Sequence, residues 1–223
     1  MTAGIELIRR EVAIPLGGDE LPADLTIPPR PAGVVVFAHG SGSSRRSVRN
    51  VQVARRLNVA GLATLLFDLL TPDEALDRAN VFDVPLLAGR LETATAWLRR
   101  EPAAAGLPLG LFGASTGAAA ALWAAADLGD DVRAVVSRGG RPDLAGPRLS
   151  LVRAPTLLVV GGADVVVLEL NREAAGQLRC TWELSTIPGA THLFEEPGAL
   201  ERVSELAAAW FTTHLPLSER GPR

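Results

Sequence analysis

Short apolar runs alternate along the chain with longer runs of helical periodicity, and this alternation restricts the possible folds more than any other feature of the sequence. The strand-like runs cover residues 33–38, 63–67, 107–112, 132–137, 156–160 and 181–187. The helical runs cover residues 47–60, 86–100, 115–127, 168–178 and 201–214. A repeated strand–helix order is typical of a mostly parallel sheet joined by crossover helices. We therefore predict an α/β fold with helices on both faces of the sheet.

The N-terminal region departs from this alternation. Residues 6–16 and 21–26 are both strand-like, and the Gly17-Gly18 pair between them predicts an antiparallel hairpin. The next run, residues 33–38, reads GVVVFA. A continuous β-branched and apolar run of this kind is expected of a strand that is covered on both faces.

The domain organisation follows from the connections between the runs. Residues 68–85 and 137–155 are too few to hold an independent cap domain, although either segment can form a small flap. No long polar linker, internal repeat or low-complexity tract divides the sequence. We predict a single domain over residues 1–215 and a flexible tail over residues 216–223.

Composition excludes several classes of function. The formal net charge of −3 argues against a protein dedicated to nucleic acid or to anionic membranes. All 22 basic residues are arginine, so a Schiff-base lysine and a Walker lysine are both excluded. The histidines and the cysteine do not have metal-ligand spacing, and we expect no metal site.

The cysteine count and the hydropathy pattern bear on the compartment. The single cysteine, Cys180, excludes an internal disulfide framework and fits a reducing cytoplasm. Residues 1–10 lack the apolar segment of a signal peptide, and no apolar stretch reaches membrane-spanning length. We expect a cytoplasmic protein without nucleic-acid or membrane partners, present as a monomer or a small homo-oligomer.

Residues 113–117, GASTG, carry the strongest chemical signal in the sequence. They join a strand-like run to a helical run, which is the context of the G-x-S-x-G nucleophile elbow. A tight turn there lifts the serine hydroxyl out of the backbone, and the flanking glycines avoid collisions with the strand and the helix. The helix that follows offers free N–H groups to a developing negative charge. The pattern predicts that Ser115 is a nucleophile.

A nucleophilic serine needs a base to accept its proton and an acid to orient that base. Asp164 and His192 each follow a predicted strand, and they come after Ser115 in the order that α/β hydrolases use. All three residues therefore fall at the carboxyl edge of the sheet, where ligands bind. We predict a triad of Ser115, Asp164 and His192. Two alternatives remain open: Asp164 as a helix-capping residue without a catalytic role, and Asp143 as a weaker candidate acid.

An oxyanion hole requires two backbone N–H groups. The residue after the nucleophile, Thr116, is expected to supply one of them. Ser41 is the candidate for the other, because it lies in the small-residue loop 39–44, HGSGSS, that follows the strand-like run 33–38. We expect His39, in the same loop, to be a structural hydrogen-bonding residue and not a second base.

Two arginines follow a further strand end. Arg138 and Arg141 are expected beside the same sheet edge, where a guanidinium is suited to binding a substrate carboxylate. Pairing with Asp143 or with glutamates in a surface loop is an equally strong alternative. Periodicity does not indicate which way these side chains point.

Several of these segments resemble the dienelactone hydrolase-like branch of the α/β-hydrolase superfamily. The matching segments are 39–42 (HGSG), 112–117 (FGASTG), 161–164 (GGAD) and 188–194 (PGATHLF). Residues 136–146 resemble a bacterial subgroup of hydrolase domains that are often fused to a phosphoribosyltransferase. The resemblance spans nearly the whole chain. It implies a sheet of about eight strands with one antiparallel strand near the N-terminus, no cap domain, and a Ser/Asp/His triad that works without a cofactor.

One departure from the family pattern affects the expected substrate. The dienelactone hydrolases that give the branch its name use a cysteine nucleophile, whereas this chain has Ser115 at that position and Cys180 far from it. This difference disfavours dienelactone itself and favours simple ester hydrolysis. We therefore expect a serine esterase that acts on small or soluble esters.

Other functions remain compatible with the same residues. A lactonase or an acyltransferase would use the same triad, because water and alcohols compete for one acyl-enzyme. A non-catalytic accessory module associated with a phosphoribosyltransferase is an alternative of a different class. The presence of all three candidate triad residues disfavours it.

Overall fold

The computed structural model describes residues 7–215. The strands are β1 (Ile8–Leu16), β2 (Asp19–Ile27), β3 (Val34–Ala38), β4 (Ala63–Phe67), β5 (Leu109–Ala114), β6 (Val132–Arg138), β7 (Thr156–Gly161) and β8 (Trp182–Ile187). The α-helices are α1 (Val48–Val59), α2 (Arg78–Phe82), α3 (Val84–Leu98), α4 (Thr116–Leu128), α5 (Val165–Ala175) and α6 (Ala199–His214). The 3₁₀ segments are η1 (Glu74–Leu76), η2 (Gly129–Asp131) and η3 (Pro142–Leu151).

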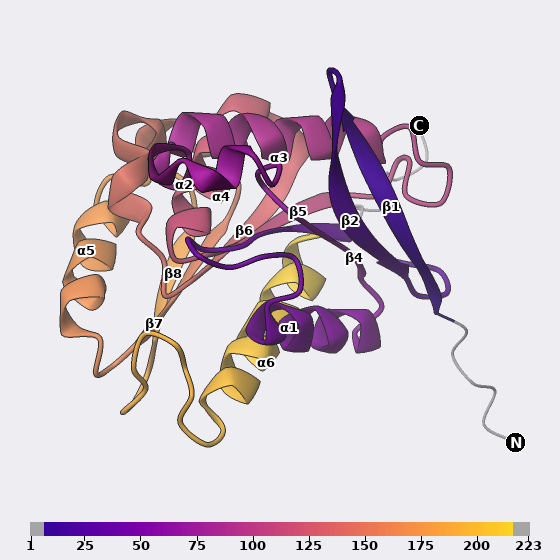
Figure 1. Ribbon diagram of the computed structural model, residues 1–223. Coiled ribbons are helices and arrows are strands. Elements are labelled where there is room, and N and C mark those ends of the chain that lie inside the picture. The colour runs from indigo at the N-terminus through magenta and orange to yellow at the C-terminus, as the bar shows by residue number, and fades with distance from the viewer. Residues whose placement is uncertain (1–6, 216–223) are drawn as a thin grey trace, which may run out of the picture.

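The continuous apolar runs form the middle of one sheet. Every residue of β3 and β4 is buried, as expected for strands that are covered on both faces. The eight strands lie in the order β1-β2-β4-β3-β5-β6-β7-β8 (Figure 1). β2 is antiparallel to both of its neighbours, and the remaining pairs are parallel. The predicted, mostly parallel sheet with one reversed strand near the N-terminus is thus confirmed.

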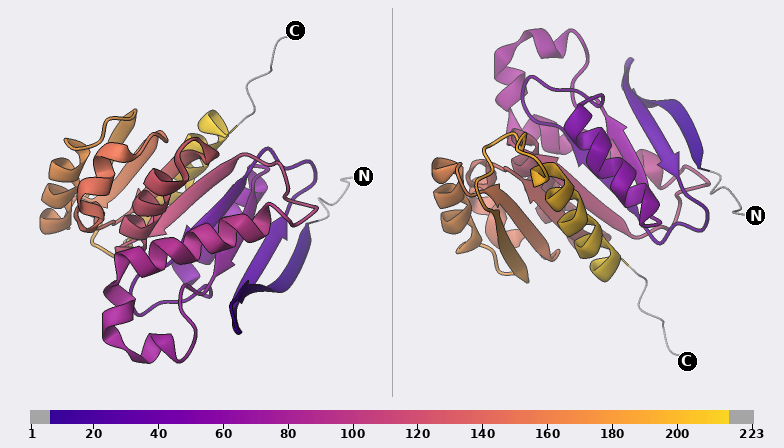
Figure 2. Two further views of the ribbon diagram at one scale, coloured as in Figure 1. Left: turned by 90° about the horizontal axis from the view of Figure 1, so that it is seen from above. Right: turned by 90° about the horizontal axis from the view of Figure 1, so that it is seen from below.

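Helices cover both faces of this sheet, as predicted (Figure 2). On one face, α1 and α6 pack against each other and against apolar side chains that include Phe37 and Phe112. On the other face, α3 and α4 pack together over side chains that include Leu65 and Leu111. Alternate residues of the central strands contribute to the two cores, as the two-residue period of a strand requires.

Most element ends lie within a few residues of their predicted positions, and α5 shows why some do not. The sequence predicts this helix from residue 168, but it begins at Val165, directly after Asp164. The three valines at its start resemble a strand, because β-branched side chains have low helix propensity. The tail predicted over residues 216–223 lies outside the described residues. Within residues 7–215, none of the helices combines the length and the apolar character needed to cross a membrane.

The connection between β4 and α3 forms a small flap, which we define as residues 71–83; it contains η1 and α2. Thr71 and Glu74 bond reciprocally: the Thr71 N–H donates to Glu74 Oε2 at 2.9 Å, and the Glu74 N–H donates to Thr71 Oγ1 at 3.3 Å. Glu74 also pairs with Arg90 of α3. These contacts fix the flap against the body of the protein.

Candidate active site

Ser115 occupies a strained turn between β5 and α4. Its φ of 52° and ψ of −122° are sparsely populated for a residue with a side chain. The turn is held by the Ser115 N–H, which donates to the Arg138 carbonyl at 3.2 Å, and by the Ser115 carbonyl, which accepts from the Ala118 N–H at 3.0 Å. The Ser115 side chain is half-buried and therefore reachable from solvent.

The two glycines of the elbow are required by close packing. A Cβ on Gly113 would overlap the backbone of α4 at Ala118. A Cβ on Gly117 would overlap the carbonyl oxygens of Ala38 and His39, at the end of β3. The turn that raises Ser115 is therefore possible only because both of these positions lack a side chain.

Asp164 and His192 meet at the same edge of the sheet. Asp164 Oδ2 lies 2.7 Å from His192 Nδ1, and the carboxylate is mostly covered, with 15% of the side chain exposed. Asp164 occupies the N-cap position of α5, yet its side chain makes no capping hydrogen bond. It is turned toward the imidazole instead of toward the helix, which argues against the simple helix-cap alternative. An N–H at Nδ1 that donates to Asp164 leaves Nε2 as the nitrogen free to accept a proton.

The loop between β8 and α6, which carries His192 and is called the His192 loop below, packs close to the end of β6. A Cβ on Gly139, which follows β6, would lie 3.2 Å from the His192 carbonyl oxygen and 3.6 Å from His192 Cε1. Among the hydrogen bonds of residues 7–215, none joins Ser115 Oγ to His192. Contacts of this type often shorten only when the reacting complex forms.

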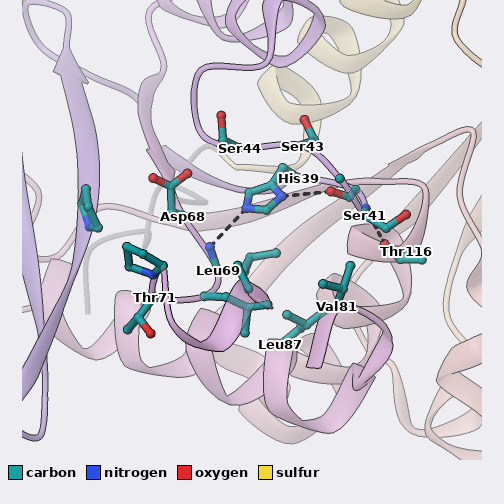
Figure 3. Close-up of a pocket in the computed structure, with 16 residues that line it drawn as sticks. His39, Ser41, Ser43, Ser44, Asp68, Leu69, Thr71, Val81, Leu87 and Thr116 are labelled. Atoms are coloured by element: carbon teal, nitrogen blue, oxygen red, sulfur yellow. Dashed lines mark hydrogen bonds between the residues drawn. The ribbon is translucent and has the colours of Figure 1, made fainter. Parts of the chain in front are cut away.

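The predicted oxyanion residues lie side by side. The Ser41 N–H donates to Thr116 Oγ1 at 2.9 Å (Figure 3). Gly40 brings the loop against the elbow, since a Cβ there would be only 3.0 Å from the Ser115 Cβ. The structure therefore brings Ser41 and Thr116 together beside Ser115, with the Ser41 amide currently bonded to the Thr116 hydroxyl.

His39 joins the loop of residues 39–44, which we call the oxyanion loop, to the segment that directly follows β4. The Leu69 N–H donates to His39 Nε2 at 3.1 Å, and His39 Nδ1 lies 3.0 Å from the Gly40 carbonyl (Figure 3). These partners require a proton on Nδ1 and none on Nε2. Burial lowers the His39 pKa below its ordinary value and so favours the neutral ring. Both nitrogens are occupied, which fits the structural role expected for this residue.

A cavity of about 290 Å³ opens beside the oxyanion loop. The loop and Thr116 form one wall, the end of β4 a second, and the flap together with α3 a third (Figure 3). The side chains of Leu69, Val81 and Leu87 make much of its surface apolar. Sequence reasoning missed these residues. The only signal was the length of the 68–85 connection, because isolated apolar residues in a short polar segment do not indicate a shared cavity.

The two candidate arginines have different environments. Arg141 makes a bidentate pair with Asp143, with Nε–Oδ1 and Nη2–Oδ2 distances of 2.9 and 2.8 Å. Both partners are thereby engaged, and Asp143 is directed at Arg141 and not at His192. Arg138 is only 7% exposed, and its Nε and Nη1 atoms have no hydrogen-bond partner among the described residues. Its guanidinium lies 5.9 Å from the centre of the Phe194 ring.

The charge on Arg138 is disfavoured by its surroundings. Burial, with a smaller contribution from the charge on Arg49, lowers the Arg138 pKa to about 10. The residue still carries a full charge at neutral pH. Arg49 Nη1 and Glu195 Oε1 are 3.4 Å apart and form an ion pair. This glutamate is therefore already engaged and does not neutralise Arg138.

Other polar residues are less suited to chemistry. Burial raises the pKa of the Cys180 thiol, which makes it a poor nucleophile, and the residue lies away from the Ser115 edge of the sheet. The His214 ring contacts the Trp210 ring in a tilted arrangement, with ring centres 4.4 Å apart. Across residues 7–215, no group of three or more His, Cys, Asp or Glu side chains is arranged to hold a metal ion.

The chain is similar in sequence and structure to known hydrolases. No family model matches the chain. A crystal structure named dienelactone hydrolase, from Anabaena variabilis, is 52% identical, covers 94% of this chain and 99% of its own, and superposes with a TM-score of 0.91. The chain belongs to the dienelactone hydrolase family of α/β hydrolases. An esterase domain from Rhodothermus marinus, 21% identical, covers 95% of this chain and 100% of its own with a TM-score of 0.74, and shares the fold.

Two curated relatives carry a different name. Both are Mycobacterium tuberculosis proteins assigned provisionally to the phosphoribosyl transferases, and they are 61% identical over 205 residues. The match covers 92% of this chain but 46% of theirs, so the chain spans about half the length of these relatives. This agrees with the resemblance to hydrolase domains that are fused to a phosphoribosyltransferase.

Proposed function

We propose that this protein is a serine esterase that cleaves carboxylic esters of small, soluble substrates in the cytoplasm. The observation that carries the proposal is the Asp164–His192 contact of 2.7 Å at the sheet edge where the strained elbow presents Ser115. An aspartate that leaves a helix N-terminus uncapped and bonds a histidine instead is the arrangement a general base requires.

In the proposed reaction, Ser115 Oγ attacks the ester carbonyl carbon while His192 Nε2 accepts the hydroxyl proton. Asp164 holds the imidazole through Nδ1 and stabilises its cationic form. The Ser41 and Thr116 N–H groups bind the oxyanion, which requires the Ser41 amide to exchange its bond to Thr116 Oγ1 for the substrate oxygen. His192 then protonates the leaving alcohol, and water releases the acyl group. Lactone opening and transfer to another alcohol would use the same acyl-enzyme.

We propose substrate contact for Arg138 alone of the two arginines. Its guanidinium has no anionic partner among residues 7–215, whereas Arg141 is paired with Asp143. Arg138 lies beside Phe194, on the His192 side of the elbow. An anionic group that reaches it would belong to the alcohol half of the ester, because His192 must protonate that half.

A second candidate is a non-catalytic module of a phosphoribosyltransferase. The specific observation in its favour is the name and the greater length of the mycobacterial relatives. The two functions differ in whether Ser115 is an activated nucleophile.

The test is intact-mass measurement after exposure to a fluorophosphonate probe, together with hydrolysis of p-nitrophenyl butyrate. We expect a single adduct on the wild type and none on Ser115→Ala, whose kcat/KM should fall by at least about 10³-fold. Ser150→Ala, which changes a surface serine in η3, should behave as the wild type. A folded wild type that is neither labelled nor active would refute the esterase and favour the accessory module.

A further inference from the structure

The cavity beside the oxyanion loop lies to one side of the proposed nucleophile. Its walls come from the oxyanion loop, Thr116, the end of β4, the flap, α3 and Pro22 of β2. None of its lining residues belongs to the Asp164 turn or to the His192 loop. In the sheet order, β4 and β3 lie on one side of β5, and β7 and β8 lie on the other. The cavity and His192 are therefore on opposite sides of Ser115.

The geometry of the proposed tetrahedral intermediate indicates which part of the ester faces the cavity and which part faces His192. The tetrahedral carbon carries Ser115 Oγ, the oxyanion, the leaving oxygen and the acyl substituent. The oxyanion must face the N–H groups of Ser41 and Thr116, and the leaving oxygen must face His192, which protonates it. The acyl substituent then points away from His192, toward the cavity. We infer that this cavity is the acyl-binding site and that it selects compact, uncharged, apolar acyl groups, an inference that rests on the proposed esterase function.

Three of the polar residues that line the cavity, His39, Asp68 and Thr71, are already engaged in hydrogen bonds. His39 is neutral and bonded at both ring nitrogens. Asp68 accepts from the Arg45 N–H at 2.7 Å and from Arg45 Nη1 at 2.6 Å. Thr71 bonds reciprocally with Glu74. No unpaired cation among the lining residues is available to a charged acyl group, whereas Leu69, Val81 and Leu87 offer apolar contact.

The cavity volume indicates the size of acyl group that the site can hold. At the ~30 Å³ that a water molecule occupies in the liquid, about 290 Å³ holds roughly ten heavy atoms. This is near the lower end of the range for small-molecule sites, which is about 300–1,000 Å³. Butanoyl to octanoyl chains or a single aromatic ring fit within it. The contacts of Glu74 with Thr71 and Arg90 fix the flap, so the wall that limits chain length is formed before substrate binds.

The experiment measures hydrolysis of p-nitrophenyl acetate and p-nitrophenyl hexanoate, which share a leaving group and differ only in the acyl chain. Val81→Trp fills the cavity from the flap. We expect it to lower kcat/KM for the hexanoate by at least about 10-fold relative to the acetate, since each methylene bound in an apolar pocket contributes about 10-fold or more. Phe82→Trp is the matched control, because Phe82 adjoins Val81 in the chain but is 47% exposed and does not line the cavity. Its acetate-to-hexanoate ratio should stay within about 2-fold of the wild type.

Leu87→Ala supplies an independent test from α3. It enlarges the cavity and should shift the preference toward p-nitrophenyl decanoate, so the inference remains testable if Val81→Trp does not fold. Unchanged acyl preference in both variants, or altered preference only among acetate esters of different alcohols, would overturn the acyl assignment while the esterase function stands. A wild type without hydrolysis and without fluorophosphonate labelling would instead remove the esterase function, and the acyl site with it.

Discussion

The stability of the fold does not explain why position 138 is an arginine. A buried guanidinium that lacks a counter-ion loses hydration without regaining it in hydrogen bonds. Its contact with the Phe194 ring compensates only in part, since such contacts contribute about 0.5–2 kcal/mol. An arginine at this position therefore points to a role in binding.

We predict that Arg138→Met separates stability from function. The free energy of unfolding should stay the same or rise by about 1 kcal/mol, because an apolar side chain of similar length removes the desolvation cost. Hydrolysis of 4-(butyryloxy)benzoate should fall about 10-fold relative to its neutral amide, 4-(butyryloxy)benzamide, as one charge-assisted contact is lost. Urea denaturation and the two kcat/KM values measure these effects. Arg141→Met should leave the substrate ratio unchanged, and a loss of stability without a change in that ratio would contradict the binding role.

At the level of single residues, the sequence identified types and order but not orientation. Ser115, Asp164 and His192 could be proposed because each follows a strand end, and strand ends are visible in the apolar pattern. Whether Asp164 faced a helix or a histidine depended on packing between α5 and the His192 loop, which are separated along the chain. The contrast between Arg138 and Arg141 arises in the same way, because pairing and burial are set by distant elements.

At the level of elements, the elbow is a junction at which three backbones come close together. α4 approaches the end of β3 so closely that Gly117 has no space for a Cβ, and it approaches β5 so closely that Gly113 has none. Glycine is otherwise unfavourable near the start of a helix, so its presence reflects this contact. Both ends of strand β4 could be predicted correctly, because all of its side chains are buried and Asp68 ends the apolar run directly after Phe67. The flap could not be predicted in detail, because its short turns depend on capping contacts and lack a periodic pattern.

We predict opposite outcomes for alanine at two helical glycines. Gly117→Ala should destabilise the protein by about 3 kcal/mol or more and abolish ester hydrolysis, because the new methyl group overlaps backbone carbonyls that cannot move independently of β3. Gly89→Ala, in α3, meets no atom within 4 Å. It should stabilise the protein by about 0.5–1 kcal/mol and leave hydrolysis unchanged. Thermal unfolding and p-nitrophenyl butyrate assays distinguish these outcomes, and a stable, active Gly117→Ala variant would contradict the close approach.

At the scale of the whole molecule, the proposed triad depends on the order of the sheet. Ser115 follows β5, Asp164 follows β7 and His192 follows β8, so their distances are set by strand pairing across β6. Helix α6 packs on one face of this part of the sheet (Figure 2). Its Phe211 is fully buried, and a Cβ on Gly110 of β5 would lie 2.6 Å from Phe211 Cε1. The ring therefore packs directly on the strand that carries the nucleophile.

This packing predicts that stability and activity are lost together. Phe211→Ala should lower the free energy of unfolding by about 3–5 kcal/mol, the cost of a large cavity in a core. If β5 to β8 unfold as one unit, tryptophan fluorescence and ester hydrolysis should disappear at the same reduced temperature, since no part of the proposed triad can persist alone. Leu151→Ala, at a side chain that is 51% exposed, should shift neither signal by more than about 0.5 kcal/mol. Loss of hydrolysis well below the fluorescence transition would show that the His192 loop unfolds independently of the sheet, and that strand order alone does not hold the site together.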